Sequence, residues 1–174
     1  MRQELINVYK FNELSEKVKE KVINRFREHE DYIMLKDNLT EMLHDELKKH
    51  NIEVLSNLKL GYSLSNSQGD GVNFTGVFEW DNNVVTITKT NYHYEHYKTV
   101  TKEYERFDSD NDNIYLSDEE YNKLDIDFSI IYKQICAVIE SAGYDEIEYR
   151  LKESTIIENI EANDYEFYDN GDIF

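Results

Sequence analysis

The chain has 174 residues, of which 40% are hydrophobic and 32% charged, and its formal net charge of −18 argues against direct bulk-electrostatic binding of DNA or RNA. Its length predicts a single domain over residues 1–174 with a hydrophobic core of its own. No apolar run reaches the length of a membrane span or a signal peptide, and one cysteine cannot form an intrachain disulfide, so we expect a cytoplasmic protein with no membrane partner.

The first third of the sequence predicts a short strand followed by two amphipathic helices. Residues 6–11 favour a strand, and Ser15 is a suitable N-cap for the helix that follows. One face of this helix has apolar residues spaced by four, namely Leu14, Val18, Val22 and Phe26. The second helix has a stripe of four leucines, namely Leu35, Leu39, Leu43 and Leu47. Asn51 is expected to end it.

From Ile52 onward the apolar residues alternate, which is typical of strands. The clearest case is the segment with apolar residues or glycine at every second position, namely Val72, Phe74, Gly76, Phe78 and Trp80. Residues 81–83 predict a hairpin turn into the next strand. Residues 91–107 predict one strand more. The middle of the chain therefore predicts three or four antiparallel strands.

The last third predicts helices again. Ser117 and Glu120 form a capping box for a short helix, and a separate helix over residues 127–143 contains Cys136 and ends at Gly143. Residues 148–152 favour a strand, residues 155–163 a brief helix, and residues 165–174 a terminal hairpin. The order of helices, strands and helices predicts an α+β fold, in which an antiparallel sheet of about four or more strands has helices packed on one face.

The loop motif Gln68-Gly69-Asp70-Gly71 is the most distinctive short segment. Glycines on both sides of Asp70 allow left-handed backbone, and the carboxylate can accept backbone N–H groups of its own turn. No GK[ST] sequence or helix follows, so a phosphate-binding loop is not indicated. We expect a structural turn, with a metal ligand or an acid at Asp70 as the functional alternative.

Residues 108–119 resemble part of a calcium-binding loop. Asp108, Asp110 and Asp112 occupy positions one, three and five of an EF-hand loop, and Glu119 occupies position twelve. Asn113 replaces the usual glycine at position six, and the preceding segment looks like a strand. A solvated acidic loop is therefore expected, while Ca²⁺ or Mg²⁺ remains a possible cofactor.

His93 and His96 are three residues apart in a segment that favours a strand. Side chains at this spacing lie on opposite faces of a strand, so a shared metal is not expected. No G-x-S-x-G motif occurs, and no catalytic residues are assigned. Were the chain an enzyme, Asp70, His93 and His96 would be its candidates.

Three segments carry a resemblance to a known group of proteins. They are the opening YKFNELSEKVKEKVINRF, the core YSLSNSQGDGVNF and the tail IEANDYEFYDNGDIF. In these motifs the chain resembles a family of small acidic proteins from phages and mobile elements of low-GC bacteria. Some relatives are anti-CRISPR proteins that act on type II effector nucleases. The resemblance implies a phage-encoded protein that works in the bacterial host cell, and it transfers no catalytic residues.

The charge distribution agrees with this implication. Residues 1–60 contain 11 Lys and Arg against 12 Asp and Glu, whereas residues 61–174 contain 8 against 25. Cas nucleases hold nucleic acids in basic channels, which an acidic protein can occupy as a mimic of the phosphate backbone. The expected partner is thus a Cas nuclease or its guide-RNA complex. The carboxylates expected to contact it are Asp108, Asp110, Asp112, Asp118, Glu119, Glu120, Asp125 and Asp127.

Two alternatives remain open at this point. One is a metal-dependent nuclease, or a nuclease-promoting inhibitor that trims guide RNA, which would need Asp70 and Mg²⁺. The other is an acidic interaction module, such as an antitoxin, that neutralises a basic partner. The mimic and the interaction module both require an acidic surface, whereas the nuclease requires a metal.

Overall fold

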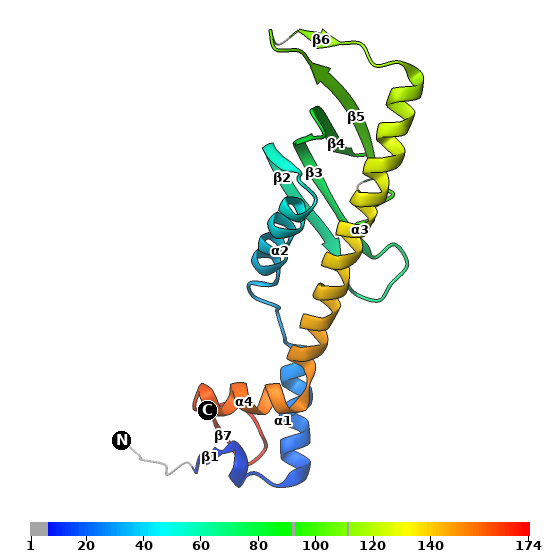
Figure 1. The fold of residues 1–174 in the computed structure, drawn as a ribbon. Coiled ribbons are helices and arrows are strands. Elements are labelled where there is room, and N and C mark those ends of the chain that lie inside the picture. The colour runs from blue at the N-terminus through cyan, green and yellow to red at the C-terminus, as the bar shows by residue number, and fades with distance from the viewer. Residues whose placement is uncertain (1–6, 92, 111) are drawn as a thin grey trace, which may run out of the picture. The chain divides into compact units, whose positions relative to one another are not determined.

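The computed structural model describes residues 7–91, 93–110 and 112–174 (Figure 1). The chain divides into two compact units. Unit 1 combines the segment that ends at Ile33 with the segment Asp145–Phe174, and unit 2 is Met34–Tyr144. Because compact units can share one domain, the single domain over residues 1–174 stays a prediction. None of the helices within the described residues combines the length and hydrophobicity that a membrane crossing requires.

Unit 2 contains a five-stranded antiparallel sheet in the order β2-β3-β4-β5-β6. Its strands are β2 (Glu53–Ser63), β3 (Gly71–Trp80), β4 (Asn83–Lys89), β5 (Val100–Phe107) and β6 (Asn113–Ile114). Between β3 and β4, Asp81 and Asn82 both have left-handed backbone, with φ of 50° and 58°. This is the hairpin turn that the sequence predicts, and it suits residues that tolerate positive φ.

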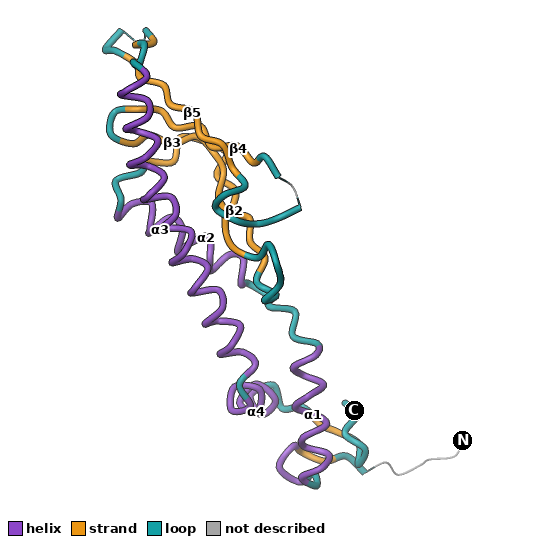
Figure 2. Tube along the Cα trace, turned by 90° about the vertical axis from the view of Figure 1, so that its right-hand side faces the viewer, coloured by secondary structure: helices purple, strands orange, loops and turns teal. Residues whose placement is uncertain are grey.

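Two helices cover one face of this sheet (Figure 2). They are α2 (Leu35–Lys49) and the part of α3 (Asp118–Leu151) that belongs to unit 2. The Tyr132 ring of α3 packs 4.4 Å from the Phe74 ring, and the Phe128 ring lies 5.3 Å from Trp80. The four leucines of α2 are buried as their spacing predicts. The predicted α+β fold with helices on one face of an antiparallel sheet is confirmed.

The end of α2 shows how one residue stops a helix. Asn51 has a left-handed φ of 55°. Its N–H bonds the Lys48 carbonyl at 3.0 Å, and the N–H of Ile52 bonds the Leu47 carbonyl at 2.9 Å. These two bonds form a Schellman motif and satisfy carbonyls that the helix leaves free. The predicted stop at Asn51 is therefore confirmed.

Unit 1 pairs the beginning of the chain with its end. Its elements are β1 (Tyr9–Lys10), the 3₁₀ helix η1 (Phe11–Glu13), α1 (Glu16–Glu28), the last residues of α3, α4 (Glu153–Ala162) and β7 (Glu166–Phe167). β1 and β7 are antiparallel, and Phe167 also bridges to Ile173 in the terminal hairpin. Its core consists of Phe11, Leu14, Val22, Ile23, Ile156, Ile160 and Phe167. Ser15 is the N-cap of α1, as predicted.

Some predicted boundaries are wrong. The helix predicted to end at Gly143 continues as α3 to Leu151, so the predicted strand over residues 148–152 is helical. Gly143 is there for packing, since a Cβ atom would lie 2.4 Å from Leu64 Cδ1. The strand predicted within residues 91–107 begins at Val100. The N-terminal strand, β1, is shorter than predicted. Residue 6 of that predicted strand and residue 92 of the later one lie outside the described residues.

Candidate functional site

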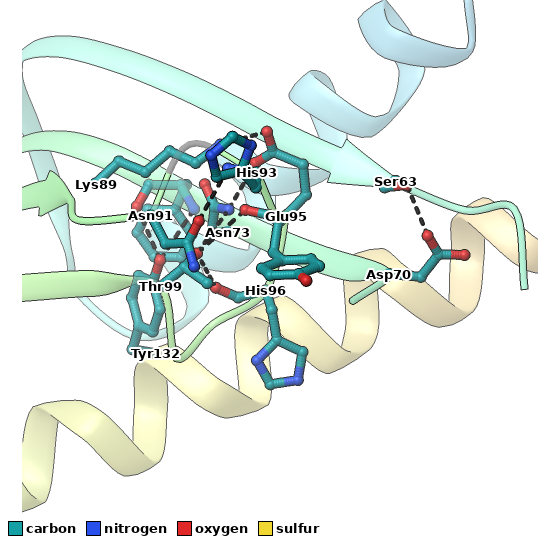
Figure 3. A network of polar contacts seen from close by, with 12 residues as sticks. Ser63, Asp70, Asn73, Lys89, Asn91, His93, Glu95, His96, Thr99 and Tyr132 are labelled. Atoms are coloured by element: carbon teal, nitrogen blue, oxygen red, sulfur yellow. Dashed lines mark hydrogen bonds and ion pairs between the residues drawn. The ribbon is translucent and has the colours of Figure 1, made fainter. Parts of the chain in front are cut away.

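The SQGDG loop is organised around the Asp70 carboxylate (Figure 3). It accepts hydrogen bonds from Ser63 Oγ at 2.7 Å, from the Ser65 N–H at 2.6 Å and from the Ser67 N–H at 2.8 Å. The serines at alternate positions thus converge on one acceptor. The Ser63 hydroxyl is the main cause of a pKa of Asp70 well below its usual range. A carboxylate held ionised by its own loop is a poor general acid or base at neutral pH.

The glycines of this region provide space for residues 93–99, here called the strap. A Cβ atom on Gly69 would lie 2.0 Å from the Tyr94 ring, and one on Gly61 would lie 2.2 Å from a Glu95 carboxylate oxygen. Gly69 also has a left-handed φ of 95°. Gly69 and Gly61 therefore allow the strap to pack on the loop and on β2.

Beneath the strap, a polar network joins β3 and β4 where their pairing ends (Figure 3). Glu95 accepts a 2.7 Å hydrogen bond from Asn73 Nδ2 and forms an ion pair with Lys89. The Tyr132 hydroxyl donates to the Phe74 carbonyl at 2.9 Å and accepts from the Phe74 N–H at 3.0 Å. Burial raises the pKa of Tyr132. The hydroxyl therefore keeps its proton, which lets it donate one hydrogen bond while it accepts another. Each of these polar groups has a partner, so the network is a structural closure of the sheet.

The two candidate histidines lie on the strap, which is a loop and not the predicted strand. Figure 3 shows their rings pointing apart. The His96 ring packs 4.2 Å from the Tyr97 ring, and burial together with Lys98 lowers the pKa of His96. Asp70, His93 and His96 thus do not form one cluster. Cys136 is buried in α3, which raises the pKa of its thiol to about 12 and makes it a poor nucleophile at neutral pH.

The segment that resembles a calcium-binding loop connects β5 to β6 and to the start of α3. Its first carboxylate, Asp108, accepts the N–H groups of Asp110 and Asp112, both at 2.9 Å. Residues 113–114 then form β6. Across the described residues, no group of three or more His, Cys, Asp or Glu side chains is placed to hold a metal ion. Asp108, Asp110, Asp112 and Glu119 therefore do not converge as EF-hand ligands do.

The carboxylates expected on α3 divide into two groups. Asp125 accepts a 3.0 Å hydrogen bond from the Tyr104 hydroxyl and lies 3.5 Å from Lys102 Nζ, while Glu120 lies 3.6 Å from Arg106. These two are occupied within unit 2. Glu120 also bonds Ser117, which is the main cause of its lowered pKa. The exposed remainder is Asp118, Glu119 and Asp127.

A further group of carboxylates lies on the open face of the sheet, opposite the helices. Strand register places Glu53 directly opposite Glu79, and Val84 lies between Glu79 and Glu105. Glu103 is two residues before Glu105, so its side chain lies on the same face. All four glutamates are exposed, and none forms an ion pair within the described residues. We call Glu53, Glu79, Glu103 and Glu105 the sheet-face carboxylates.

The carboxylates of unit 1 have a different environment. Lys10 pairs with Asp164 at 2.7 Å, and Arg25 pairs with Asp172 at 2.5 Å. Arg25 also donates to the Gly171 carbonyl at 3.0 Å. The basic helix near the beginning of the chain therefore neutralises part of the acidic C-terminal segment. Lys21 and Arg27 make longer ion pairs to the same segment, so the basic patch of α1 is mostly occupied.

The sheet-face carboxylates were not predicted from the sequence because Glu79, Glu103 and Glu105 lie 26 to 52 residues after Glu53. Strand alternation was the sequence signal that could have identified these carboxylates, because every second residue of a strand lies on the same face of the sheet. Glu79 lies between the inward-facing Phe78 and Trp80, and Glu103 and Glu105 flank the buried Tyr104. A search for contiguous acidic runs selects helix and loop segments instead.

No family model, curated protein or solved structure matches this chain.

Proposed function

We propose that this chain is a phage-encoded anti-CRISPR protein that acts in the cytoplasm of the bacterial host cell. It binds a Cas9-type nuclease, or that nuclease's guide-RNA complex, through an acidic surface that replaces nucleic acid. The observation that carries this proposal is the group of four exposed sheet-face carboxylates with no ion pair in the described residues. The sequence motifs that resemble phage and mobile-element proteins agree with it.

The sheet-face carboxylates suit a basic partner for an electrostatic reason. Like charges directly opposite each other on a sheet are unfavourable, and Glu53 opposite Glu79 is such a pair. Lys or Arg side chains from a partner would convert this repulsion into attraction. Residues two apart on a strand are separated by about 6.7 Å, so Glu103 and Glu105 offer two charges in a line. A row of fixed negative charges is what a channel built for phosphates recognises.

The first test is the salt dependence of binding to a purified Cas9-type nuclease with its guide RNA. Screening shortens the range of charge interactions from about 10 Å at 0.1 M salt to about 3 Å at 1 M. We therefore expect affinity to fall steeply as NaCl is raised, and inhibition of DNA cleavage to fall with it. An affinity that does not change with salt would contradict binding by charge complementarity.

The second test locates the surface with variants in which groups of carboxylates are neutralised. The sheet-face variant combines Glu53→Gln, Glu79→Gln, Glu103→Gln and Glu105→Gln. The matched control combines four exposed carboxylates of unit 1 that form no ion pair among the described residues, through Glu20→Gln, Glu28→Gln, Glu158→Gln and Glu161→Gln. A third variant tests the exposed α3 group through Asp118→Asn, Glu119→Gln and Asp127→Asn.

We expect the sheet-face variant to bind about 100-fold more weakly, which four contacts of roughly 0.7 kcal/mol each would produce. The unit 1 control should lose far less, because it changes the net charge equally without touching the proposed surface. Equal losses in both would mean that only net charge matters. The larger loss in the α3 variant would move the contact to the carboxylates predicted from the sequence.

The nuclease alternative is not put forward, because Asp70 is occupied by its own loop and lies in no cluster with His93 and His96. Neutralisation of another basic protein, as an antitoxin does, would use the same sheet face. Capture of partners from host lysate distinguishes these cases, since the proposal requires that a Cas nuclease be recovered. Recovery of a different basic protein in its place would contradict it.

A further inference from the structure

The open face of the sheet also carries a depression beside the sheet-face carboxylates, and its lining is mostly uncharged apart from Lys59 and the paired Lys89 and Glu95. Its volume is about 600 Å³. The floor is formed by threonine and valine side chains of the two central strands, namely Thr75, Val77, Thr86 and Thr88. β-Branched side chains have few rotamers, so this floor is stiff. An uncharged floor next to a row of charges is a surface with two distinct parts.

The strand register shows which floor residues lie next to the sheet-face carboxylates. Val77 pairs with Thr86, which pairs with Glu103, and Thr88 pairs with Thr101 in the next row. The Thr88 and Thr101 hydroxyls are hydrogen bonded at 2.9 Å. The floor is thus bordered by glutamates along β5 and at one end, and by Lys59 along β2, where it pairs with Thr75. The strap closes the other end, where Glu95 is already paired with Lys89.

The dimensions of this face suit a helix. Four adjacent strands spaced by about 4.8 Å span roughly 14 Å, and an α-helix with its side chains is about 10–12 Å wide. A peptide in extended conformation recognises a sheet through the backbone groups of an edge strand. The open face offers side chains only, as a helix requires.

We infer that the open face docks a basic amphipathic α-helix of the partner protein. The apolar or small residues of the helix lie on the threonine and valine floor, and its Lys and Arg side chains reach Glu79, Glu103 and Glu105. This inference rests on the proposed function, because it uses the same face, and it adds the structural element that the face recognises. Charge complementarity selects the basic side of the helix, and the uncharged floor selects its amphipathic character.

The test uses the full chain and three fluorescent synthetic peptides of equal length. One has Leu and Ala along one face and Arg along the other, the second has the same composition in an order without amphipathicity, and the third is oligoarginine. Two variants of equal charge change are compared, Thr86→Lys in the floor and Asn122→Lys on the exposed side of α3. Circular dichroism confirms that each variant is folded, and fluorescence anisotropy measures affinity.

We expect the amphipathic peptide to bind at least about tenfold more tightly than the other two. Thr86→Lys should weaken that binding about tenfold, whereas Asn122→Lys should change it less than about twofold. Hydrogen exchange should show protection of β3 and β4 by the peptide. Equal binding of all three peptides, or equal effects of the two variants, would overturn the inference. Self-association of the chain that Thr86→Lys abolishes would also overturn it, because a second copy would then be the occupant.

The outcomes separate this inference from the proposed function. If the amphipathic peptide binds as expected and no Cas9-type nuclease is inhibited, helix docking stands and the proposed function fails. If nuclease inhibition depends on the sheet-face carboxylates and is unchanged by Thr86→Lys, the proposed function stands and helix docking fails.

Discussion

Units 1 and 2 have similar net charges and arrange them in opposite ways. Residues 7–33 and 145–174 hold 8 Lys and Arg against 16 Asp and Glu, a net of −8, and residues 34–144 hold 10 against 20, a net of −10. In unit 1, cations of α1 pair with carboxylates near the C-terminus. In unit 2, four glutamates on the open sheet face have no such partner among the described residues.

This comparison corrects the meaning of the charge asymmetry along the sequence. The near-neutral residues 1–60 and the acidic residues 61–174 do not become a neutral body and an acidic body, because the fold brings the two ends of the chain together. A surface available to a partner is identified by which carboxylates lack cations. Net charge by itself does not locate it.

The largest expected effect concerns how unit 2 is held together internally. Tyr132→Phe removes the hydroxyl that both donates to and accepts from the Phe74 backbone. Two buried backbone groups then lose their partner, so we expect the free energy of unfolding of unit 2 to fall by about 2–4 kcal/mol. Urea unfolding measures this loss, and hydrogen exchange at the Phe74 amide localises it.

Tyr144→Phe is the matched control for this prediction. Its hydroxyl lies 3.4 Å from Asp70, at a position that is only half-buried, so the expected loss is smaller. Equal losses in the two variants would mean that the Tyr132 hydroxyl has no special role in closing the sheet.

The next effect in size concerns the Asp70 loop and depends on pH. Asp70→Asn replaces an acceptor of several hydrogen bonds with a group that is half donor, which should destabilise unit 2 by about 1–3 kcal/mol at pH 7. The folded pKa of Asp70 is lowered, so its contribution is complete above the unfolded value near 3.9 and is lost as the pH falls toward the folded value.

Denaturant unfolding of both proteins at several pH values tests the sign of this dependence. The difference in stability between wild type and Asp70→Asn should be constant between pH 5 and 8 and should narrow only below about pH 4. A difference that widens as the pH falls would show that Asp70 is protonated in the folded protein.

Local patterns predicted those parts of the fold that depend on neighbours in sequence. The leucine stripe of α2, the stop at Asn51 and the turn at Asp81 and Asn82 follow from spacing and from residues that accept positive φ. The helix end predicted at Gly143 was wrong because this glycine instead leaves space for Leu64, which lies 79 residues earlier in the chain. A glycine that ends a helix and one that permits packing look alike in sequence.

The acidity of the candidate site was expected from the sequence, whereas the positions of its sheet-face carboxylates were not. An acidic surface was expected, and the exposed carboxylates of α3 are part of the acidity of unit 2. Asp125 and Glu120 are engaged by the sheet because a helix turns one side inward, which a contiguous acidic run does not reveal. Strand register, which joins Glu53 to Glu79, depends on contacts between distant segments.

A smaller effect sharpens the contrast between the two units. Glu79→Lys places a cation directly opposite Glu53 and removes the cross-strand repulsion, so we expect unit 2 to gain about 0.2–1 kcal/mol. Glu103→Lys changes the charge equally, but its residue faces Thr86 and should gain less. Thermal unfolding of the two variants compares them. A loss of stability in Glu79→Lys would show that the two glutamates do not repel each other.

The smallest expected effect tests both units in one experiment, because salt acts on them in opposite directions. Added NaCl screens the attraction between Arg25 and Asp172 in unit 1 and the repulsion between Glu53 and Glu79 in unit 2. Hydrogen exchange of buried amides should therefore become faster in α1 and slower in β3, each by less than about fivefold. Salt also strengthens apolar burial in both units. The Glu79→Gln variant lacks the repulsion, so the change in its hydrogen exchange with salt measures the contribution of apolar burial alone. If the wild type and this variant gain equal protection in β3, the sheet-face carboxylates are too well hydrated to repel one another, and a basic partner would gain little by pairing with them.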